Sequence, residues 1–212
     1  MWGLGVFVMA SSLTVFGGTN GFVVPIFRGE PGAAFAGWEN FTVSMGSPGN
    51  KGDMAGSSAS ITLLQKANGA QVLGSGNIYN GAEKSLFEIR YASPDPVSEV
   101  HLQVRTLGTE LDYGSVRLFA WTDSLSAPRT ELDRLAFGPP PPAPGSGSGV
   151  SSLWAWDLTG LDATSIAITF NAADINLSLD SATLDVRVVP EPGPLALGLL
   201  GLAMLGLLRP RR

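Results

Sequence analysis

His101, the only histidine, is the first residue to consider as a catalytic base or a metal ligand. It lies in the alternating stretch 97–107, between Val100 and Leu102, on the side that carries polar residues. The chain has no cysteine, which excludes disulfides, zinc–thiolate sites and thiol nucleophiles. Because one histidine without cysteine cannot build a usual zinc site, we expect His101 to be a solvated strand residue. We predict no catalytic residue and no enzyme activity.

Carboxylates in the last third of the chain are the next candidates, either for calcium or for a catalytic pair. Calcium takes about six to eight oxygen ligands from Asp, Asn and backbone carbonyls, and Asn171, Asp174 and Asn176 stand close together in a predicted turn. No EF-hand or RTX-type spacing is present, and turns of β proteins favour Asp and Asn for conformational reasons. The sequence therefore leaves open whether one structural calcium ion is bound, and we assign no metal ligands. A glycosidase needs two carboxylates at a set separation, which spacing along the chain cannot show.

Tryptophan side chains could stack on sugar rings. Trp154 and Trp156 share one side of their stretch, which favours burial in a core. Trp121 alternates with an arginine and a phenylalanine, so it is the better candidate for a glycan contact. Core burial is the favoured reading for the set, which also includes Trp38.

Short strands must position these residues, because period-two alternation recurs along the body of the chain while helical periodicity does not. In 85–91, Phe87, Ile89 and Tyr91 share one side, and Glu88 and Arg90 take the other. The same alternation occurs in 97–107, 115–122, 165–170 and 182–188, and further candidates are 59–64, 77–79 and 153–158.

One-sided alternation is typical of antiparallel sheets with one face in solvent. We therefore predict an all-β fold, a single antiparallel β-sandwich over residues 25–189. Roughly eight or nine strands in a domain of this size favour a jelly-roll-like arrangement. Residues 138–149, GPPPPAPGSGSG, are either a linker or a long loop between two strands. We favour the loop, because the stretch that follows is too short for a core of its own.

The charge balance argues against nucleic acid as a partner. The net charge is −5, and three of the thirteen basic residues stand at the very C-terminus. Without them, ten basic residues face eighteen acidic ones. A nucleic-acid-binding protein needs clustered Lys and Arg to neutralise phosphates.

The first 24 residues carry no charge and are apolar or small. They suit an export signal peptide, with small residues in 11–18 as cleavage sites, although the basic start of such signals is missing. The alternative is a buried first strand with Gly17 and Gly18 in a turn.

Residues 190–212 contain three parts: a Pro-Glu-Pro lead, an apolar run at 195–208 and an arginine-rich end. Each proline fixes φ and lacks an N–H, so the lead is not helical. A helix over 193–208 would be about 24 Å long, slightly short of a hydrocarbon core of ~30 Å. It would anchor the chain transiently, with its basic end in the cytoplasm. The lead is Pro190, Glu191 and Pro192, and the basic residues are Arg209, Arg211 and Arg212.

This order of parts resembles the PEP-CTERM sorting signal of Gram-negative bacteria, over 189–212. The resemblance implies processing by exosortase, a membrane-embedded peptidase, and export to the envelope, often in organisms that make extracellular polysaccharide. The alternative is a plain C-terminal helix packed on the domain. Segments 38–41, 76–79 and 180–186 are also similar to a group of PEP-CTERM proteins, which implies a β-sandwich without a known activity.

We therefore expect an exported cell-envelope or extracellular-matrix protein with a structural or binding role. Its domain would stand in the periplasm, held in the inner membrane by the C-terminal helix, until exosortase passes it to the cell surface or medium. One alternative is a carbohydrate-binding module that uses exposed aromatics on extracellular polysaccharide. The other alternative is a polysaccharide-active enzyme, but we identify no group of residues in the sequence that supports it. No cofactor is expected beyond the calcium considered above.

Overall fold

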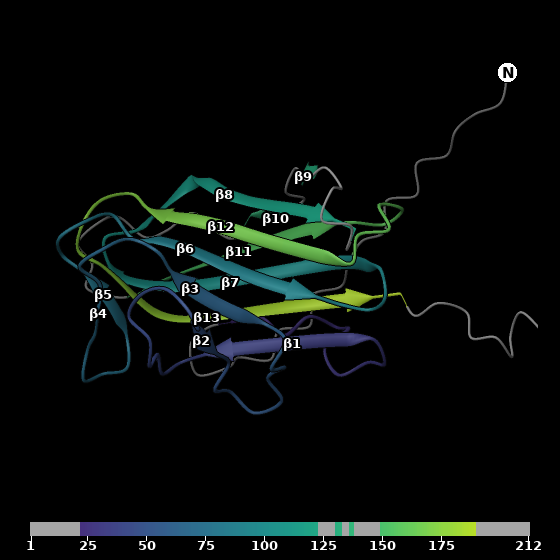
Figure 1. The fold of residues 1–212 in the computed structure, drawn as a ribbon, viewed down its shortest axis with the longest axis horizontal. Helices are drawn as coiled ribbons and strands as arrows, with labels where there is room; N and C mark the ends of the chain where they lie inside the picture. Colours follow the sequence, from purple (N-terminus) through teal and green to yellow (C-terminus); the bar gives the residue numbers. More distant parts are fainter. Residues whose placement is uncertain (1–21, 123–129, 133–135, 138–148, 190–212) are drawn as a thin grey trace, which may run out of the picture.

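The computed structural model describes residues 22–122, 130–132, 136–137 and 149–189. In this part of the chain the structure is all-β, with two antiparallel sheets and no helix. Figure 1 shows the long strands of the two sheets running along the longest axis of the molecule. The predicted all-β class and the antiparallel pairing are confirmed.

The first sheet, here called sheet A, has seven strands. Its central strand is β13, which pairs with β7 on one side and with β1 and β5 on the other. In spatial order the strands are β10 (Ala136–Phe137), β11 (Val150–Asp157), β7 (Val97–Gly108), β13 (Leu177–Val188), β5 (Ile78–Asn80) and β4 (Gln71–Val72), with β1 (Ala33–Trp38) beside β13.

The second sheet, sheet B, has six strands. The chain passes between the two sheets from β6 to β7 and from β7 to β8, and again from β11 to β12 and from β12 to β13. In spatial order the strands are β2 (Asn50–Lys51), β3 (Thr62–Gln65), β6 (Leu86–Ala92), β12 (Ser165–Ala172), β8 (Leu111–Trp121) and β9 (Thr130–Leu132).

One hydrophobic core joins the facing sides of the two sheets. It contains the residues that alternation placed inward: Phe87 and Ile89 of β6, Leu118 of β8 and Leu184 of β13 are at most 1% exposed. Such alternation buries every second side chain of a strand and leaves the others on the outer face. The molecule is therefore sandwich-like, as the pattern predicted.

Part of the outer face of sheet A, over β7 and β13, is covered, which the sequence did not predict. Residues 22–32, which we call the N-terminal strap, lie across β7 and β13. Gln103 of β7 accepts a hydrogen bond from the backbone N–H of Val23 (2.6 Å) and donates one to the Val23 carbonyl (2.7 Å). The Arg28 guanidinium donates two hydrogen bonds to the Asp185 carboxylate of β13, at 2.5 and 2.7 Å. β13 is consequently buried on both faces over most of its length.

The strap begins inside the stretch 1–24 that the sequence assigned to an export signal. Phe22 is 6% exposed, and Val23 is held by Gln103. Phe22 and Val23 are therefore packed against the body of the protein.

The flanks of the low-complexity stretch 138–149 lie in one sheet, because β10 and β11 pair with each other. Residues 138–148 themselves, like 1–21 and 190–212, are outside the described residues. Within the described ranges, no helix is long and apolar enough to cross a membrane. The helix expected after Pro192 falls outside these ranges.

Candidate functional site

The outer face of sheet B, unlike that of sheet A, is not covered by the strap, and its side chains form an ordered pattern. Strand register brings outward residues of neighbouring strands into three rows. The rows are Leu64, Glu88, Thr169 and Arg117; Thr62, Arg90, Ala167, Phe119 and Glu131; and Ala92, Ser165 and Trp121.

Side-chain size hollows this face along β12. That strand contributes only small outward residues, Ser165, Ala167 and Thr169. Larger side chains rise from its neighbours: Arg90 from β6 and Trp121 from β8. Because adjacent strands are about 4.8 Å apart, β6 and β8 are roughly 10 Å apart across this trough.

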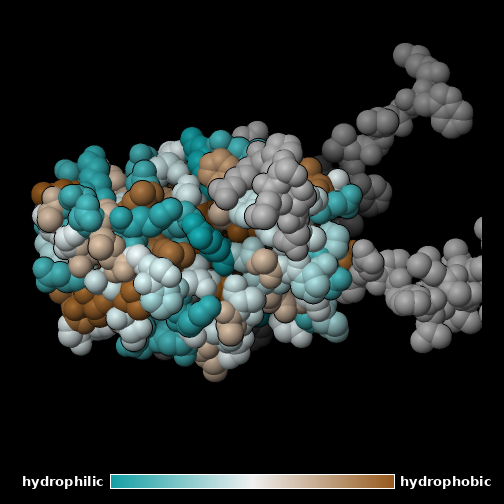
Figure 2. All heavy atoms as spheres, in the orientation of Figure 1, coloured by the Kyte–Doolittle hydropathy of each residue, from teal (hydrophilic) through white to brown (hydrophobic). Residues whose placement is uncertain are grey.

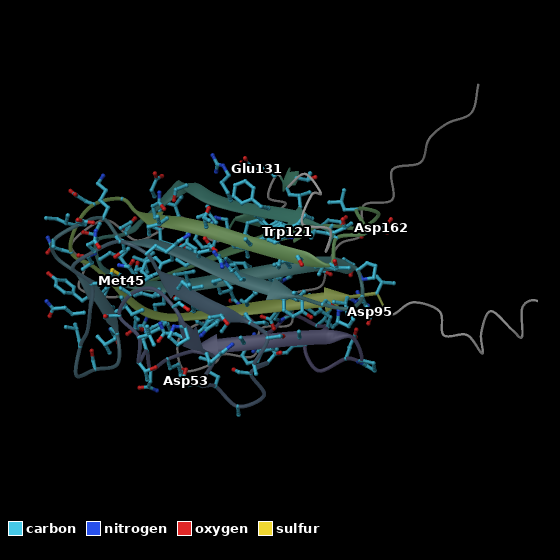
Figure 3. All side chains as sticks on the ribbon, viewed as in Figure 1. Met45, Asp53, Asp95, Trp121, Glu131 and Asp162 are labelled. Atoms are coloured by element: carbon cyan, nitrogen blue, oxygen red, sulfur yellow. The ribbon has the colours of Figure 1, made fainter. Side chains whose placement is uncertain are left out.

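A groove of about 430 Å³ opens on this face, within the range of roughly 300–1,000 Å³ that small-ligand sites occupy. It runs from the loops beside β3, past Arg90, to the end of β8, where Figure 3 labels Trp121. Its lining mixes hydroxyls, one guanidinium and aromatic or aliphatic surface. The lining residues are Ser47, Pro48, Ser60, Thr62, Leu64, Arg90, Tyr91, Ala92, Trp121, Ser165 and Ile166.

Glu88 lies beneath two cations at the edge of the groove. Lys66 donates to one carboxylate oxygen at 2.5 Å, and the Nε of Arg90 donates to the other. Burial raises the pKa of Glu88, but the hydrogen bonds and charges of Lys66 and Arg90 outweigh burial and lower the pKa below its usual 4.5. Glu88 is therefore an anion that serves to hold Arg90 in place.

Three other charged side chains border the same face. Arg117 pairs with Glu131 of β9 at 2.6 Å, and both side chains are about half exposed. The ammonium of Lys51 bonds neutral oxygens, the Ala59 carbonyl at 2.7 Å and the Thr62 hydroxyl at 3.0 Å. Figure 2 shows polar and apolar residues interspersed over the face that it draws.

This arrangement is suited to binding. A half-buried indole offers a flat apolar surface with a polar edge, and hydroxyls and a guanidinium beside it offer directional hydrogen bonds. The groove lining contains no Asp, Glu or His. In the described part of the chain, no three His, Asp or Glu side chains gather as metal ligands would.

The structure places the predicted aromatics as follows. Trp121 lies at the end of β8, half-buried, and lines the groove. Trp38, Trp154 and Trp156 are at most 1% exposed in the core, which confirms the burial reading for these three.

His101 was expected on a solvated face, and this expectation is wrong. It is 7% exposed because the strap covers β7. The ring of Phe27 packs edge-on against it at 5.3 Å between centroids, and Nε2 lies 2.8 Å from a carboxylate oxygen of Glu99. It is remote from the groove, on the other sheet.

Of the three residues considered for calcium, Asp174 and Asn176 lie in the turn between β12 and β13, whereas Asn171 lies in β12. Asp174 accepts from the backbone of Ile175, and Asn176 accepts from the Tyr79 hydroxyl. Asn171 belongs to β12, where its backbone N–H donates to Ser115. The sorting residues Pro190, Glu191 and Pro192 and the arginines Arg209, Arg211 and Arg212 lie outside the described residues.

Sequence reasoning did not identify Arg90 and Ser165 as site residues. Alternation put Arg90 on the outward side of β6, but only the register Ala92–Ser165–Trp121 shows that β6, β12 and β8 align beside Trp121. Register between strands distant in sequence is not visible in the pattern of either strand alone.

No family model and no curated protein sequence matches this chain. Among solved structures, it is similar to the enzymatically active domain of tailspike protein 4 of bacteriophage CBA120, with 11% sequence identity and a TM-score of 0.32. The match covers 74% of this chain and 19% of the tailspike chain, so this chain spans less than a fifth of that protein's length.

Proposed function

We propose that this protein is an exported envelope or matrix protein whose jelly-roll-like sandwich binds polysaccharide on the outer face of sheet B. The observation that carries the proposal is the groove beside Trp121, where an indole, hydroxyls and the Arg90 guanidinium line one depression.

Polysaccharides suit such a surface for a physical reason. A sugar ring has two faces of C–H groups, which pack on an aromatic plane, and a rim of hydroxyls, which require hydrogen bonds. Trp121 of β8 supplies the plane, Arg90 of β6 supplies polar groups from the opposite side of the trough, and Ser165 of β12 supplies a hydroxyl on its floor.

Binding to immobilised polysaccharides tests the proposal, with wild type, Trp121→Ala and Tyr79→Ala compared on the same panel. Removing a half-buried indole from a stacked contact removes about 1.5–3 kcal/mol of apolar burial, which corresponds to roughly 10–100-fold weaker binding. Tyr79 is a matched aromatic control, because it lies on β5 of the other sheet. The proposal fails if no polysaccharide is retained or if both variants bind like wild type.

The export part of the proposal is supported by the sequence of residues 189–212, with its Pro-Glu-Pro lead, apolar run and terminal arginines. The inner membrane and exosortase are the partners it implies. We expect deletion of 193–212 to leave the protein unprocessed and soluble in the periplasm or medium. Unchanged membrane association of that truncation in fractionated cells would contradict the sorting role.

A purely structural matrix role is the second candidate. It predicts that the folded protein binds no glycan, whatever the state of Trp121. The panel above therefore separates the two roles.

A further inference from the structure

The surface around the groove has a charge opposite to that of the body of the protein. Outside the C-terminal arginines the chain carries eighteen acidic and ten basic residues. Among the described residues, the three rows of sheet B and the side chains that the structure shows bonded to them contain four cations and two carboxylates. The cations are Lys51, Lys66, Arg90 and Arg117, and the carboxylates are Glu88 and Glu131.

These charges do not cancel near the groove. Glu131 is paired with Arg117, and the single charge of Glu88 is shared between Lys66 and Arg90. Lys51, beside Thr62, bonds only neutral oxygens. One net positive charge therefore belongs to the Lys66–Glu88–Arg90 group, and another to Lys51.

Arg90 is the cation best placed to contact a ligand. Its side chain is 60% exposed and lines the groove. Its Nε is occupied by Glu88, whereas its two Nη atoms make no hydrogen bond to any residue in the described part of the chain. A guanidinium edge of this kind pairs with the two oxygens of a carboxylate, because the donors and acceptors have matching planar geometry.

Glu88 holds the Arg90 guanidinium in one position. Its carboxylate is held by Lys66 as well as by Arg90, and its side chain is only 9% exposed. Arg90 is thus fixed at its Nε, which lowers the rotamer freedom that a ligand would otherwise have to remove.

We propose that the groove takes an acidic polysaccharide, one whose sugars carry carboxylates, with Arg90 pairing a sugar carboxylate while Trp121 stacks on a ring. This inference rests on the proposed function and names the substrate class of the same site. The lysines Lys51 and Lys66 add longer-range attraction along the chain of the polysaccharide.

The test uses polygalacturonate and alginate as acidic probes and carboxyl-reduced polygalacturonate as a neutral probe with the same backbone linkage. Wild type is expected to bind the acidic polymers and to bind the reduced polymer much more weakly. Arg90→Gln should bind the acidic polymers roughly tenfold more weakly, as expected for loss of a charge-assisted pair. Arg90→Lys keeps the charge but lacks the planar guanidinium. Its affinity for the acidic polymers should lie between those of wild type and Arg90→Gln.

Arg187→Gln is the matched control for net charge. Arg187 lies on β13 of sheet A, half exposed and paired with Glu30, so its loss should leave binding unchanged. Thermal unfolding of Arg90→Gln checks that the sheet is intact. Rising salt should weaken binding of the acidic probes more than binding of the neutral one.

The outcomes separate the two proposals. Equal binding of the reduced and acidic polymers, with no effect of Arg90→Gln, overturns the acidic substrate class and leaves polysaccharide binding standing. Acidic binding that is equally weakened by Arg187→Gln also overturns it, because the effect would then be one of net charge. Binding that Trp121→Ala does not change, or no binding of any glycan, overturns the proposed function itself.

Discussion

Replacing Arg28 by glutamine should destabilise the fold strongly, because it removes the partner of a fully buried carboxylate. Asp185 is 0% exposed, and both its oxygens accept hydrogen bonds from Arg28, at 2.5 and 2.7 Å. Arg28 also lies over the ring of Phe35, 3.9 Å from its centroid. The contacts together hold the N-terminal strap on sheet A.

The expected loss follows from the burial of the pair. Removing one member of a buried ion pair costs about 3–5 kcal/mol. The Arg28 side chain is 23% exposed, and glutamine retains donors that can reach the carboxylate, so we expect about 2–4 kcal/mol. At ~2–4 °C per kcal/mol for a domain of this size, the midpoint of thermal unfolding should fall by roughly 5–15 °C.

The loss should depend on pH in a defined direction. Burial raises the pKa of Asp185 above its usual 3.8, against the lowering effects of the Arg28 hydrogen bonds and charge and of His101. A carboxyl whose folded pKa is raised contributes most to stability at low pH, and that contribution is lost as pH rises through the folded pKa. Without Arg28 the pKa rises further, so Arg28→Gln should be less harmful near pH ~4 than near pH ~7.

Equilibrium unfolding in denaturant at the two pH values measures this effect for wild type, Arg28→Gln, Asp185→Asn and the double variant. The double variant should lose less than the sum of the single losses, since the two sites interact directly. Arg187→Gln, whose partner Glu30 is exposed, should change stability little. A small loss for Arg28→Gln that is the same at both pH values would refute the assigned role of the strap.

Two further predictions concern other parts of the fold. Gly108 ends β7 with a φ of +75°, and a Cβ there would lie 2.6 Å from the Asn176 carbonyl oxygen, so Gly108→Ala should cost about 2 kcal/mol or more. Gly74→Ala, at a position with open space, is the control, and equal stability of the two variants in denaturant would contradict the prediction. Because folding lowers the pKa of Glu88, its ionised carboxylate contributes to the stability of the fold above pH 4.5. This contribution is lost as the pH falls through the pKa of the folded state. Wild type should therefore lose more stability on acidification than Glu88→Gln, and parallel acid unfolding curves would count against this.

Alternation predicted the core-facing sides of the long strands because burial on one face imposes a period of two. It placed Phe87 and Ile89 inward and Trp121 outward, as the structure has them. The prediction needed no long-range information, since each strand carries its own pattern.

The strap and strand β1 were not predicted, for related reasons. The strap follows the sheet through side chains such as Gln103 and Arg28, so it leaves no periodic pattern of its own. β1, Ala33–Trp38, has the sequence AAFAGW, in which no polar residue alternates with apolar ones. Since the strap was missed, the polar side of β7 was read as solvated and His101 was misplaced.

The groove could not be predicted because it depends on register. Arg90 and Trp121 belong to strands that do not pair with each other, and β12, distant in sequence, lies between them. The sequence identified Trp121 by its outward position. The small residues of β12 form a trough only because β12 lies between β6 and β8, and this strand order cannot be read from the sequence.

The most direct test of polysaccharide binding on sheet B is an NMR titration of the folded domain with a polygalacturonate oligosaccharide, following backbone amides and the Trp121 indole N–H. We predict that shifts concentrate at Arg90, Ser165 and Trp121, on three adjacent strands, and leave the strap and β13 unchanged. Shifts confined to sheet A or to the strap would contradict the central claim, as would a spectrum that saturating oligosaccharide does not change.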